Sequence, residues 1–514
     1  MTSNRQFFKH TLIFGVGGIL GQLVPLILLP LYTHYLPPVD YGILDVVIKT
    51  SDIINTIFLV GGIRLAAMTF YKQAENEEAR RRIAVTISTL LWVAVAVAIT
   101  ASIVFVDYIE YFLKTEDTKL LAFGMATALL GALVGVPMTL MQARLESLRY
   151  VLTHITMSLV RLGLSVYFIA GLHWGIWGAL YAQALVSSVS AILLTYRELR
   201  IGSIYPDTSK WKEILLFALP LVPTGILAFF YGMSDRIFIL HFGPYERSAA
   251  MGAVGLYALA GRLMEVSGMM GVAPMQRVWT AEMYDVYKQP DASMVFGNFA
   301  LRLLCVQAFA VTFISIFSTE IVRVMSGNSY HDAALIIPLF GIYSLLSLFA
   351  AQMNNTFYIT RKTNYIFFCN MFALPFMLHF MLLFVPYWGI MGAIIAFILS
   401  HTVYVGVVYV VSRRFFYIRY PFGKMAMLLA ITALCYGLSC LCGCGVEECA
   451  ASSKWEKIAG LWNNIQWFSI TGKAGVMFLW GITVWFSGIL SPEDKAIAHQ
   501  VVKKGLQKMH LYKR

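Results

Sequence analysis

The sequence has few charged side chains. Asp, Glu, Lys and Arg make up 13% of its 514 residues, whereas hydrophobic residues make up 59%. Soluble domains are about half apolar and about one-quarter charged, so this composition excludes a soluble globular protein. Stretches of roughly 20 apolar residues, long enough to cross a bilayer, recur from Phe8 to Ser491 with short gaps between them. The chain is therefore expected to lie mostly in lipid.

The strict alternation of apolar and polar residues that marks a membrane β-strand is also missing. The low-charge stretches are continuous runs of Leu, Ile, Val, Ala and Phe. They predict an all-α, polytopic membrane protein with about fourteen transmembrane helices. The predicted spans are 8–35, 41–70, 83–106, 119–142, 150–170, 174–196, 214–241, 250–283, 294–318, 333–358, 364–385, 389–411, 424–443 and 467–489.

The predicted extramembrane segments are short and hold no recognisable catalytic constellation. The longest external loop, 444–466, has only Glu447, Glu448 and Glu456 as acids. A membrane-embedded glycan polymerase or ligase needs a larger aqueous loop with acid, base or metal-binding groups, so an enzyme is disfavoured. A Gly-rich phosphate loop followed by Lys is absent, which disfavours nucleotide hydrolysis. The sequence predicts no catalytic residue, metal or cofactor.

Cysteines are few, and most of them gather near the end of the predicted span 424–443. They are Cys435, Cys440, Cys442, Cys444 and Cys449. A metal site would need a recognisable paired spacing, which this irregular run lacks. A small apolar helix end, with room for one extracytoplasmic disulfide, is favoured instead. The role of these cysteines stays open.

Acidic residues are scarcer than basic ones, and the net charge is +12. Lys and Arg collect in cytoplasmic loops because they resist translocation. With a cytoplasmic N-terminus, about 25 cations fall inside and about 6 outside. Topology thus accounts for the basic charge without a nucleic-acid partner, and both termini are expected in the cytoplasm. The first span lacks a small-residue cleavage site, so it is expected to be a retained helix.

Two segments of the chain are nearly identical. Trp174–Ala179 recurs as Trp388–Ala393, at an offset of 214 residues. At the neighbouring offset of 213, two cations, one acid, one Gly and one Tyr of the first half also recur in kind. The pairs are Lys49 with Arg262, Arg64 with Arg277, Asp52 with Glu265, Gly42 with Gly255 and Tyr71 with Tyr284, and a loop shorter by six residues also matches His34 with His241. These matches predict a duplicated six-helix unit.

The duplication divides the chain into three predicted parts. They are a six-helix lobe at 1–200, a second at 201–415, and two extra helices with a basic tail at 416–514. An even-numbered unit keeps its membrane orientation when duplicated, so an axis along the membrane normal should relate the two lobes. Two such bundles can rock about a central cavity, which is the mechanical basis of alternating access. The repeat therefore favours a transporter.

Cations inside the predicted spans are the candidate substrate-binding residues. Each costs about 2.5 to 3.5 kcal/mol at a helix centre, so most should face the bundle interior or water. On a continuous helix Lys49 and Arg64 would lie about 60° apart around the axis and about 22 Å apart along it, so one face would carry both. Their counterparts should repeat that geometry in the second half. The candidates are Lys49, Arg64, Arg161, Arg262, Arg277 and Arg302, and two further cations, Arg236 and Lys473, also lie within spans.

Simpler explanations stay open for most of these charges. The pairs that could neutralise one another are Lys49 with Asp52, Arg262 with Glu265, and Asp235 with Arg236. Arg64, Arg277 and Arg302 lie near the cytoplasmic boundary, where long side chains can snorkel. Arg161 has no acidic neighbour in its own helix, which favours a cavity role. Buried carboxylates can titrate or bind cations, so the candidate ion-coupling residues, with structural pairing as the alternative, are Asp52, Asp235, Glu265 and Glu282.

Several short motifs together resemble a known group. They are Phe8-Lys9-His10-Thr11-Leu12, Leu29-Pro30-Leu31-Tyr32, Asp40-Tyr41-Gly42-Ile43-Leu44, Ser234-Asp235-Arg236, Val254-Gly255-Leu256-Tyr257-Ala258 and the two Trp-Gly-Ile-x-Gly-Ala segments. Over roughly residues 5–510 the sequence resembles the polysaccharide transport branch, the Wzx-type flippases, of the multidrug/oligosaccharidyl-lipid/polysaccharide (MOP) exporter superfamily. The resemblance implies two six-helix lobes in a V-shaped bundle plus two extra helices.

The resemblance also implies a substrate and partners. The substrate is an undecaprenyl-pyrophosphate-linked oligosaccharide, such as an O-antigen, capsule or exopolysaccharide repeat unit, moved to the outer leaflet of the bacterial inner membrane. The expected partners are this lipid-linked oligosaccharide, membrane lipids, a polysaccharide polymerase and glycosyltransferases, and the protein is expected to be a monomer. The alternatives are a lipid II-type flippase and a MATE-like cation-coupled drug antiporter, the latter disfavoured by the excess of cations. The glycan and the coupling ion stay open.

Overall fold

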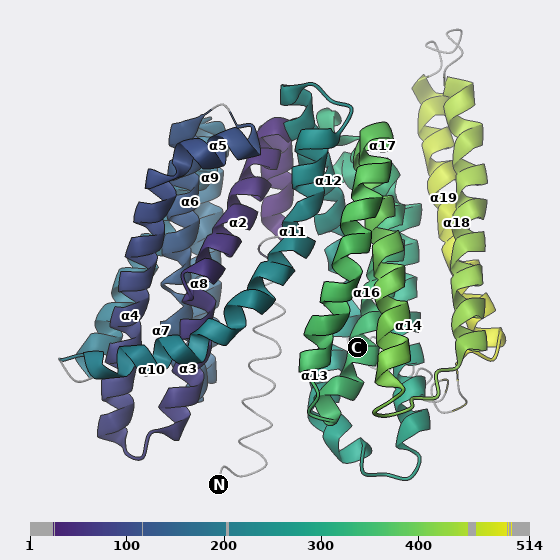
Figure 1. The fold of residues 1–514 in the computed structure, drawn as a ribbon. Coiled ribbons are helices and arrows are strands. Elements are labelled where there is room, and N and C mark those ends of the chain that lie inside the picture. The colour runs from purple at the N-terminus through teal and green to yellow at the C-terminus, as the bar shows by residue number, and fades with distance from the viewer. Residues whose placement is uncertain are drawn as a thin grey trace, which may run out of the picture. The chain divides into compact units, whose positions relative to one another are not determined.

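The described part of the chain is helical throughout and contains no strand (Figure 1). The computed structural model describes residues 24–490, apart from residues 25, 116, 202–204 and 451–458, together with residues 492 and 495. Most of the predicted span 8–35 and the end of the basic tail lie outside the described residues. The prediction of an all-α, polytopic membrane protein is confirmed.

The helices of the first half follow a short helical segment at residues 26–35. They are α2 (Pro38–Ile57), α3 (Val60–Gln73), α4 (Glu77–Val104), α5 (Val106–Leu113), α6 (Thr118–Ala132), α7 (Gly135–Ala143), α8 (Ser147–Ser165), which continues as a π-helical turn at Val166–Gly171, and α9 (Gly175–Ile201).

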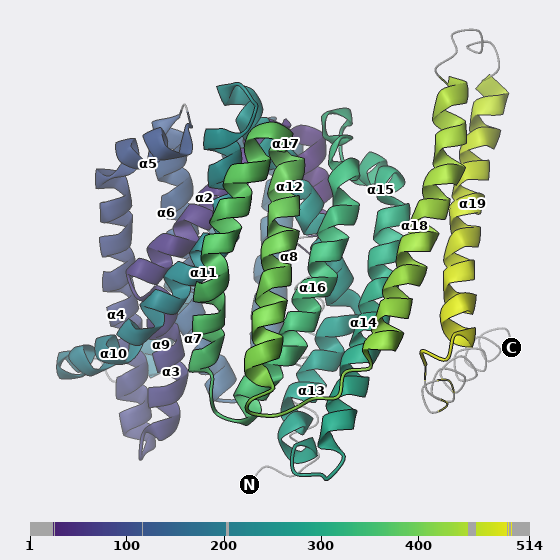
Figure 2. The same ribbon diagram turned by 45° about the vertical axis from the view of Figure 1, so that its right-hand side comes forward.

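Eight further helices follow in the second half of the repeat. They are α10 (Trp211–Ala218), α11 (Val222–Phe242), α12 (Arg247–Ser267), α13 (Ala273–Val286), α14 (Ala292–Ile316), α15 (Ser318–Met325), α16 (Ala333–Ile359) and α17 (Asn364–Ser412). The last two helices, α18 (Phe422–Ala450) and α19 (Ala459–Phe486), lie side by side in both views (Figures 1 and 2).

Ten of the described helices are long and apolar enough to cross a membrane, or eleven if the bent pair of α2 and α3 forms one span. The long helix α17 counts once, although its 49 residues cover two predicted spans and Gly389 interrupts its helical geometry with φ 53° and ψ −125°. The stretch Ile470–Phe486 of α19 is a shorter apolar helix and is not in this count. Described helices overlap each predicted span from 41–70 to 467–489, but the count of ten or eleven is below the predicted fourteen.

The span that carries Lys49 and Arg64 is broken between them. The axes of α2 and α3 differ by 56°, and Leu59 at the break has a left-handed φ of 62°. A side chain at Gly62 would place its Cβ 2.5 Å from the Cβ of Ala218, so α3 packs closely on α10. The expectation that one continuous helix face carries both cations is therefore wrong. In the second half, the π-helical turn Gly268–Val272 changes the helical phase in the same way.

The repeated Trp-Gly-Ile motif has the same local structure in both copies. Gly175 has φ 55° and Gly389 has φ 53°, a left-handed conformation that glycine adopts without steric cost. Trp174 stacks on Phe168 with ring centroids 5.1 Å apart, and Trp388 stacks on Phe384 at 5.3 Å. The sequence match therefore reflects a duplicated structural element and not a chance similarity.

Two glycines that the repeat makes equivalent touch each other. A Cβ on Gly42 would lie 3.0 Å from the backbone nitrogen of Gly255, and a Cβ on Gly255 would lie 3.1 Å from the backbone nitrogen of Gly42. The same added carbon on Gly255 would meet the carbonyl oxygen of Pro38 at 1.9 Å. Only glycine permits this close crossing of α2 and α12.

Packing separates the chain into two compact units. The first contains residues 1–260, 322–336 and 367–400, and the second contains residues 261–321, 337–366 and 401–514. In the first unit, the buried residues Leu36, Leu44 and Leu180 belong to one apolar cluster. In the second, Trp279 stacks on Phe299 with ring centroids 4.0 Å apart. The predicted lobes 1–200 and 201–415 are defined by sequence repetition and not by packing, so this division does not test them.

Candidate functional site

The first unit contains a polar cavity of about 390 Å³ among α3, α6, α7, α8 and α9. Two predicted substrate-binding cations, Arg64 and Arg161, both line it. The described residues that line the cavity include no Asp or Glu. Its other polar lining residues are Thr139, Gln142, Tyr150, His154, Ser158, Gln183 and Ser187. The cavity is thus cationic, with neutral hydrogen-bonding groups around the two guanidinium groups.

One face of α8 supplies much of the polar wall. Tyr150, His154, Ser158 and Arg161 follow one another at spacings of four, four and three residues, which keeps them within about 80° around the helix. The rings of Tyr150 and His154 stack with centroids 6.4 Å apart. Leu152 and Leu159 on the opposite face are exposed, as lipid-facing residues of a membrane helix are. The sequence thus makes α8 amphipathic, with a polar stripe that faces the cavity.

Two glycines, on α6 and α7, lie where the side chains of α3 and α9 enter the cavity. A Cβ on Gly135 would lie 2.9 Å from Cδ of Arg64, so the missing side chain leaves room for this arginine to pass. A Cβ on Gly131 would lie 3.4 Å from Oγ of Ser187 and 3.6 Å from Nε2 of Gln183. The two positions are one helical turn apart. Small residues here keep the polar groups of three helices accessible from the cavity.

Three polar atoms beside this cavity are buried without a hydrogen-bond partner. They are Nε of Arg161, Nδ1 of His154 and Oε1 of Gln183. A buried polar group without a partner costs roughly 1–3 kcal/mol, and more when the group is charged. Such atoms are expected where a bound molecule completes the hydrogen bonds. A guanidinium group offers several donors in one plane, which suits phosphate and carboxylate oxygens.

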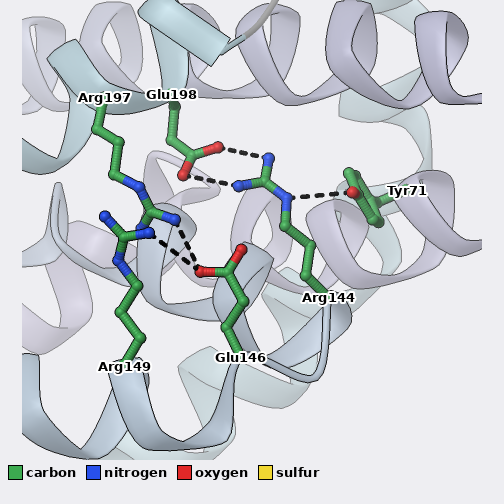
Figure 3. A network of polar contacts seen from close by, with 6 residues as sticks. All are labelled: Tyr71, Arg144, Glu146, Arg149, Arg197 and Glu198. Atoms are coloured by element: carbon green, nitrogen blue, oxygen red, sulfur yellow. Dashed lines mark hydrogen bonds and ion pairs between the residues drawn. The ribbon is translucent and has the colours of Figure 1, made fainter.

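A second group of arginines, at one end of the same helices, is paired with acids (Figure 3). Arg144 donates two hydrogen bonds to Glu198, at 3.0 and 2.6 Å, and a third to the hydroxyl of Tyr71 at 3.1 Å. Burial by itself would lower the pKa of Arg144, but the hydrogen bonds and negative charge of Glu198 raise it above its ordinary value. This arginine therefore stays charged and joins α3, the turn after α7, and α9.

The neighbouring acid Glu146 holds two more arginines of this network (Figure 3). Arg197 donates to its Oε2 at 2.7 Å, and Arg149 approaches the same oxygen at 3.7 Å. These contacts fix the start of α8 against α9, one residue before the cavity-lining Tyr150. The network frames the cavity, whereas Arg64 and Arg161 line it. Sequence reasoning missed the network because its partners are up to 73 residues apart in the chain.

Three buried charges meet where α2 and α11 pack together. Arg236 donates from Nε to Oδ2 of Asp45 at 2.9 Å, and from Nη1 to Asp235. Its guanidinium group also lies over the ring of Tyr257 at 5.3 Å. The pairing of Asp235 with Arg236 is the structural alternative raised from the sequence. Sequence reasoning missed Asp45, although a carboxylate within a predicted span carries the same insertion cost as the cations that were considered.

The remaining candidates are spread over other helices. Arg262 forms an ion pair with Glu265 at 3.0 Å on α12, which is the pairing alternative raised from the sequence. Lys473 of α19 pairs with Glu320 of α15 at 2.7 Å. The other predicted site residues do not line the cavity described above: Lys49 and Arg302 are half-buried on α2 and α14, and Asp52, Arg277 and Glu282 are exposed on α2 and α13.

The cysteines whose side chains are described form no disulfide bond. They are Cys305, Cys369, Cys435 and Cys440. The side chains of Cys442, Cys444 and Cys449 lie outside the described residues. Residues 451–458 of the predicted loop 444–466 also lie outside them, whereas the rest of that segment belongs to α18 and α19, so the predicted loop is too long. Among the described side chains, no group of three or more His, Cys, Asp or Glu residues is arranged to hold a metal ion.

The fold is similar to that of known membrane transporters. A MATE-family multidrug resistance transporter of the MOP superfamily, in an inward-facing conformation, has a TM-score of 0.62 at 18% identity, over 76% of this chain and 94% of its own. The lipid II flippase MurJ, in an inward closed conformation, has a TM-score of 0.68 at 11% identity, over 93% of this chain and 100% of its own. At such identities the likeness establishes the fold: this is a polytopic protein with the architecture of MOP transporters.

The sequence comparison defines the family within this class. The polysaccharide biosynthesis protein family matches residues 7–280, more than half of the 514 residues, and the chain belongs to this family. Curated proteins give no match by sequence. A MOP superfamily transporter from Pyrococcus furiosus, described as having a binding pocket of reversed polarity, has a TM-score of 0.51 at 17% identity, over 79% of this chain and 95% of its own. The resemblance inferred from the motifs is confirmed.

Proposed function

We propose that this protein is a flippase that translocates an undecaprenyl-pyrophosphate-linked oligosaccharide across the bacterial cytoplasmic membrane by alternating access. The observation that carries the proposal is the cavity in which Arg64 and Arg161 lie without an Asp or Glu among its described lining residues. Membership of the polysaccharide biosynthesis protein family supports a glycan-linked substrate. The MOP-type fold, shared with a lipid II flippase, supports transport rather than enzymatic catalysis.

The chemistry of the cavity suits a diphosphate attached to a sugar. Two guanidinium groups in a medium of low dielectric form strong, charge-assisted hydrogen bonds with phosphate oxygens. Gln183, Ser187 and Thr139 offer neutral donors and acceptors for sugar hydroxyls. A volume of about 390 Å³ lies within the usual range for small-molecule sites, roughly 300–1,000 Å³. The polyprenyl chain would stay in lipid against the apolar outer face of α8.

The proposed topology follows the sequence expectations. Both termini are cytoplasmic, the lobes are 1–200 and 201–415, and two extra helices with a basic tail follow at 416–514. The protein acts as a monomer beside glycosyltransferases and a polysaccharide polymerase. Along the transport path, four cations outside the cavity contact the headgroup at other stages, and three acids outside it remain candidates for ion coupling. The cations are Lys49, Arg262, Arg277 and Arg302, and the acids are Asp52, Glu265 and Glu282.

A cation-coupled drug antiporter is the main alternative that the fold allows, because a MATE-family transporter shares it. A cavity for cationic drugs would be lined by carboxylates and aromatic rings, whereas the described lining contains two arginines and no carboxylate. A lipid II-type flippase is harder to distinguish, since lipid II also presents a diphosphate. The cavity therefore favours an anionic lipid headgroup. It does not distinguish between the glycans that could be attached to it, which the transport experiment below compares.

The test is transport by the purified protein in vesicles. Wild type should translocate undecaprenyl-diphosphate-N-acetylglucosamine faster than lipid II and should leave the cationic dye ethidium behind. Arg161→Gln should slow this transport, whereas Arg80→Gln should not, because Arg80 is half-buried on α4, pairs with Glu77 and does not line the cavity. Transport of ethidium without transport of the diphosphate lipid would overturn the proposal in favour of the antiporter. A preference for lipid II would show that the proposed substrate is wrong but would leave the proposed flippase mechanism standing.

A further inference from the structure

The cavity of the first unit lies along a helical hairpin and has two ends that differ in chemistry. α7 and α8 pack together and are joined by a three-residue turn, so they run antiparallel. Gln142 and Tyr150 lie within four residues of this turn and mark one end of the cavity. Arg161 lies fifteen residues after the turn, and Arg64 lies against Gly135, nine residues before it. Both arginines therefore belong to the end of the cavity that is farther from the turn.

The end near the turn presents aromatic rings to the cavity. Tyr150 and His154 both line it, and their ring planes differ by 20° with centroids 6.4 Å apart. Thr139 and Gln142 of α7 add a hydroxyl and an amide to the lining. A sugar ring has an apolar C–H face that packs on an aromatic ring, and hydroxyl groups around its rim that need hydrogen-bonding partners. The side chains at this end supply both kinds of contact.

The unpartnered nitrogen of His154 distinguishes a sugar from a phosphate at this end. Nδ1 of His154 is buried without a hydrogen-bond partner among the described residues. It donates in one tautomer of the neutral ring and accepts in the other. A sugar hydroxyl both donates and accepts, so it satisfies either tautomer, whereas an ionised phosphate oxygen only accepts. The guanidinium groups of Arg64 and Arg161 are donors only, which suits phosphate.

The polar stripe of α8 is missing from the equivalent helix of the second copy. At the offset of 214, the residues equivalent to Tyr150, His154 and Ser158 are Asn364, Phe368 and Phe372. Phe368 and Phe372 are exposed, with exposed fractions of 58% and 55%. The duplicated helix thus has apolar, exposed side chains where α8 turns an imidazole and a hydroxyl into the cavity. The aromatic and polar wall described above belongs to the first copy.

The spacing along α8 suits a sugar that is bonded directly to a diphosphate. At a rise of 1.5 Å per residue, His154 lies about 10 Å and Tyr150 about 16 Å from Arg161 along the helix axis. Helix side chains lean toward the N-terminus, which is the direction from Arg161 to Tyr150. The long side chain of Arg161 thus brings its guanidinium group closer to the two rings. A sugar attached to a diphosphate at this guanidinium group meets the rings next.

We propose that Tyr150 and His154 form the subsite for the first sugar of the substrate, the hexopyranose bonded to the diphosphate, an inference that rests on the proposed function. The sugar packs its C–H face on the ring of Tyr150, and one of its hydroxyls forms a hydrogen bond with Nδ1 of His154. Arg64 and Arg161 hold the phosphates at the other end of the cavity. The headgroup is thus bound with its sugar toward the turn between α7 and α8.

Equilibrium binding of three lipids in nanodiscs tests the subsite. They are undecaprenyl-diphosphate-N-acetylglucosamine, the methyl ester of undecaprenyl diphosphate, which has the same charge without a sugar, and undecaprenol. Wild type should bind the glycolipid roughly fivefold to tenfold more tightly than the methyl ester. Tyr150→Leu should bind these two lipids equally and still prefer both to undecaprenol. A full preference for the glycolipid in Tyr150→Leu would overturn the proposal.

Two variants serve as controls for the loss of the ring. Tyr150→Phe keeps the ring and should keep the wild-type preference for the glycolipid. Tyr205→Leu removes an exposed tyrosine that does not line the cavity and should also keep it. Equal binding of the glycolipid and the methyl ester by wild type would reject the sugar subsite alone. Equal binding of all three lipids by wild type would reject the proposed function as well.

A second measurement does not require Tyr150→Leu to fold. In protein labelled with 3-fluorotyrosine, the fluorine resonance that disappears in Tyr150→Phe belongs to Tyr150. This resonance should shift when the glycolipid is added and should shift less with the methyl ester, because the sugar covers the ring. Shifts of equal size with both lipids would contradict the subsite.

Discussion

Gly175 and Gly389 adopt the same left-handed conformation 214 residues apart, whereas the chemistry around them has diverged. At this offset the cavity residues Arg161 and His154 correspond to Pro375 and Phe368. In the second unit, Gln307 donates to Ser267 at 2.7 Å and to Ser344 at 2.9 Å. Turns and close helix crossings are shared by both copies because packing requires them. The cavity arginines are not shared, so packing does not explain them.

The same contrast appears where the two copies meet. Gly42 and Gly255 are equivalent and in contact, so the crossing of α2 and α12 is nearly symmetric. Three residues away from Gly42, Asp45 pairs with Arg236, and the equivalent position holds Ala258. A buried ion pair contributes little net stability compared with apolar residues of similar size. The two copies therefore share this helix crossing but hold different side chains beside it.

Removal of Arg236 should have the largest effect on stability. Arg236→Gln leaves Asp45 and Asp235 buried together without their common partner, and breaking a buried ion pair costs about 3–5 kcal/mol. Thermal unfolding in detergent should therefore show a much lower melting temperature. An unchanged melting temperature would show that Arg236 does not stabilise the two buried carboxylates.

The apolar residues at the equivalent positions of the other copy can be introduced into this cluster. The triple variant Asp45→Ala, Asp235→Leu and Arg236→Leu installs the residue types found at Ala258, Leu28 and Leu29. It should fold with a stability equal to or above that of wild type, because replacement of a buried ion pair by apolar groups is often neutral or stabilising by about 1–4 kcal/mol. A protein that fails to fold would show that the charges are structural and would break the comparison.

The cavity arginine without a counterpart should matter for transport. Arg161→Gln removes a charge-assisted hydrogen bond worth about 1.5–3 kcal/mol, which corresponds to a roughly tenfold to hundredfold slower translocation of undecaprenyl-diphosphate-N-acetylglucosamine. The melting temperature should stay the same or rise, since a buried cation is removed. Arg80→Gln provides the matched control. Wild-type transport by Arg161→Gln would place the headgroup elsewhere.

Substitution of Gly135, which lies against the side chain of Arg64, should have a smaller effect on transport. In Gly135→Ala the new Cβ would lie 2.9 Å from Cδ of Arg64, and this flexible side chain must shift. We expect transport to fall by about threefold and stability to change by less than about 1 kcal/mol, because a long side chain adjusts easily. The double variant Gly135→Ala with Arg64→Gln should be no slower than Arg64→Gln alone. A further loss in the double variant would show that Gly135 acts through packing.

The sequence predicts the helical class and most of the spans, because lipid demands long apolar helices. It predicts the repeat, since glycines such as Gly42 and Gly175 are needed for backbone conformations that no other residue adopts easily. It does not predict the break at Leu59, where a branched residue adopts a left-handed φ that tertiary packing imposes. Nor does it predict that Asp45 meets Arg236, because contacts between residues 191 positions apart leave no local pattern.

The most direct test of the cationic cavity is equilibrium binding of two lipids that differ only in their headgroup. Wild-type protein in nanodiscs should bind undecaprenyl diphosphate at least tenfold more tightly than undecaprenol, because Arg64 and Arg161 hold the phosphates. The variant with both Arg64→Gln and Arg161→Gln should bind the two lipids equally and keep its affinity for the alcohol. If the double variant retains the full preference for the diphosphate, the two arginines do not form the headgroup site.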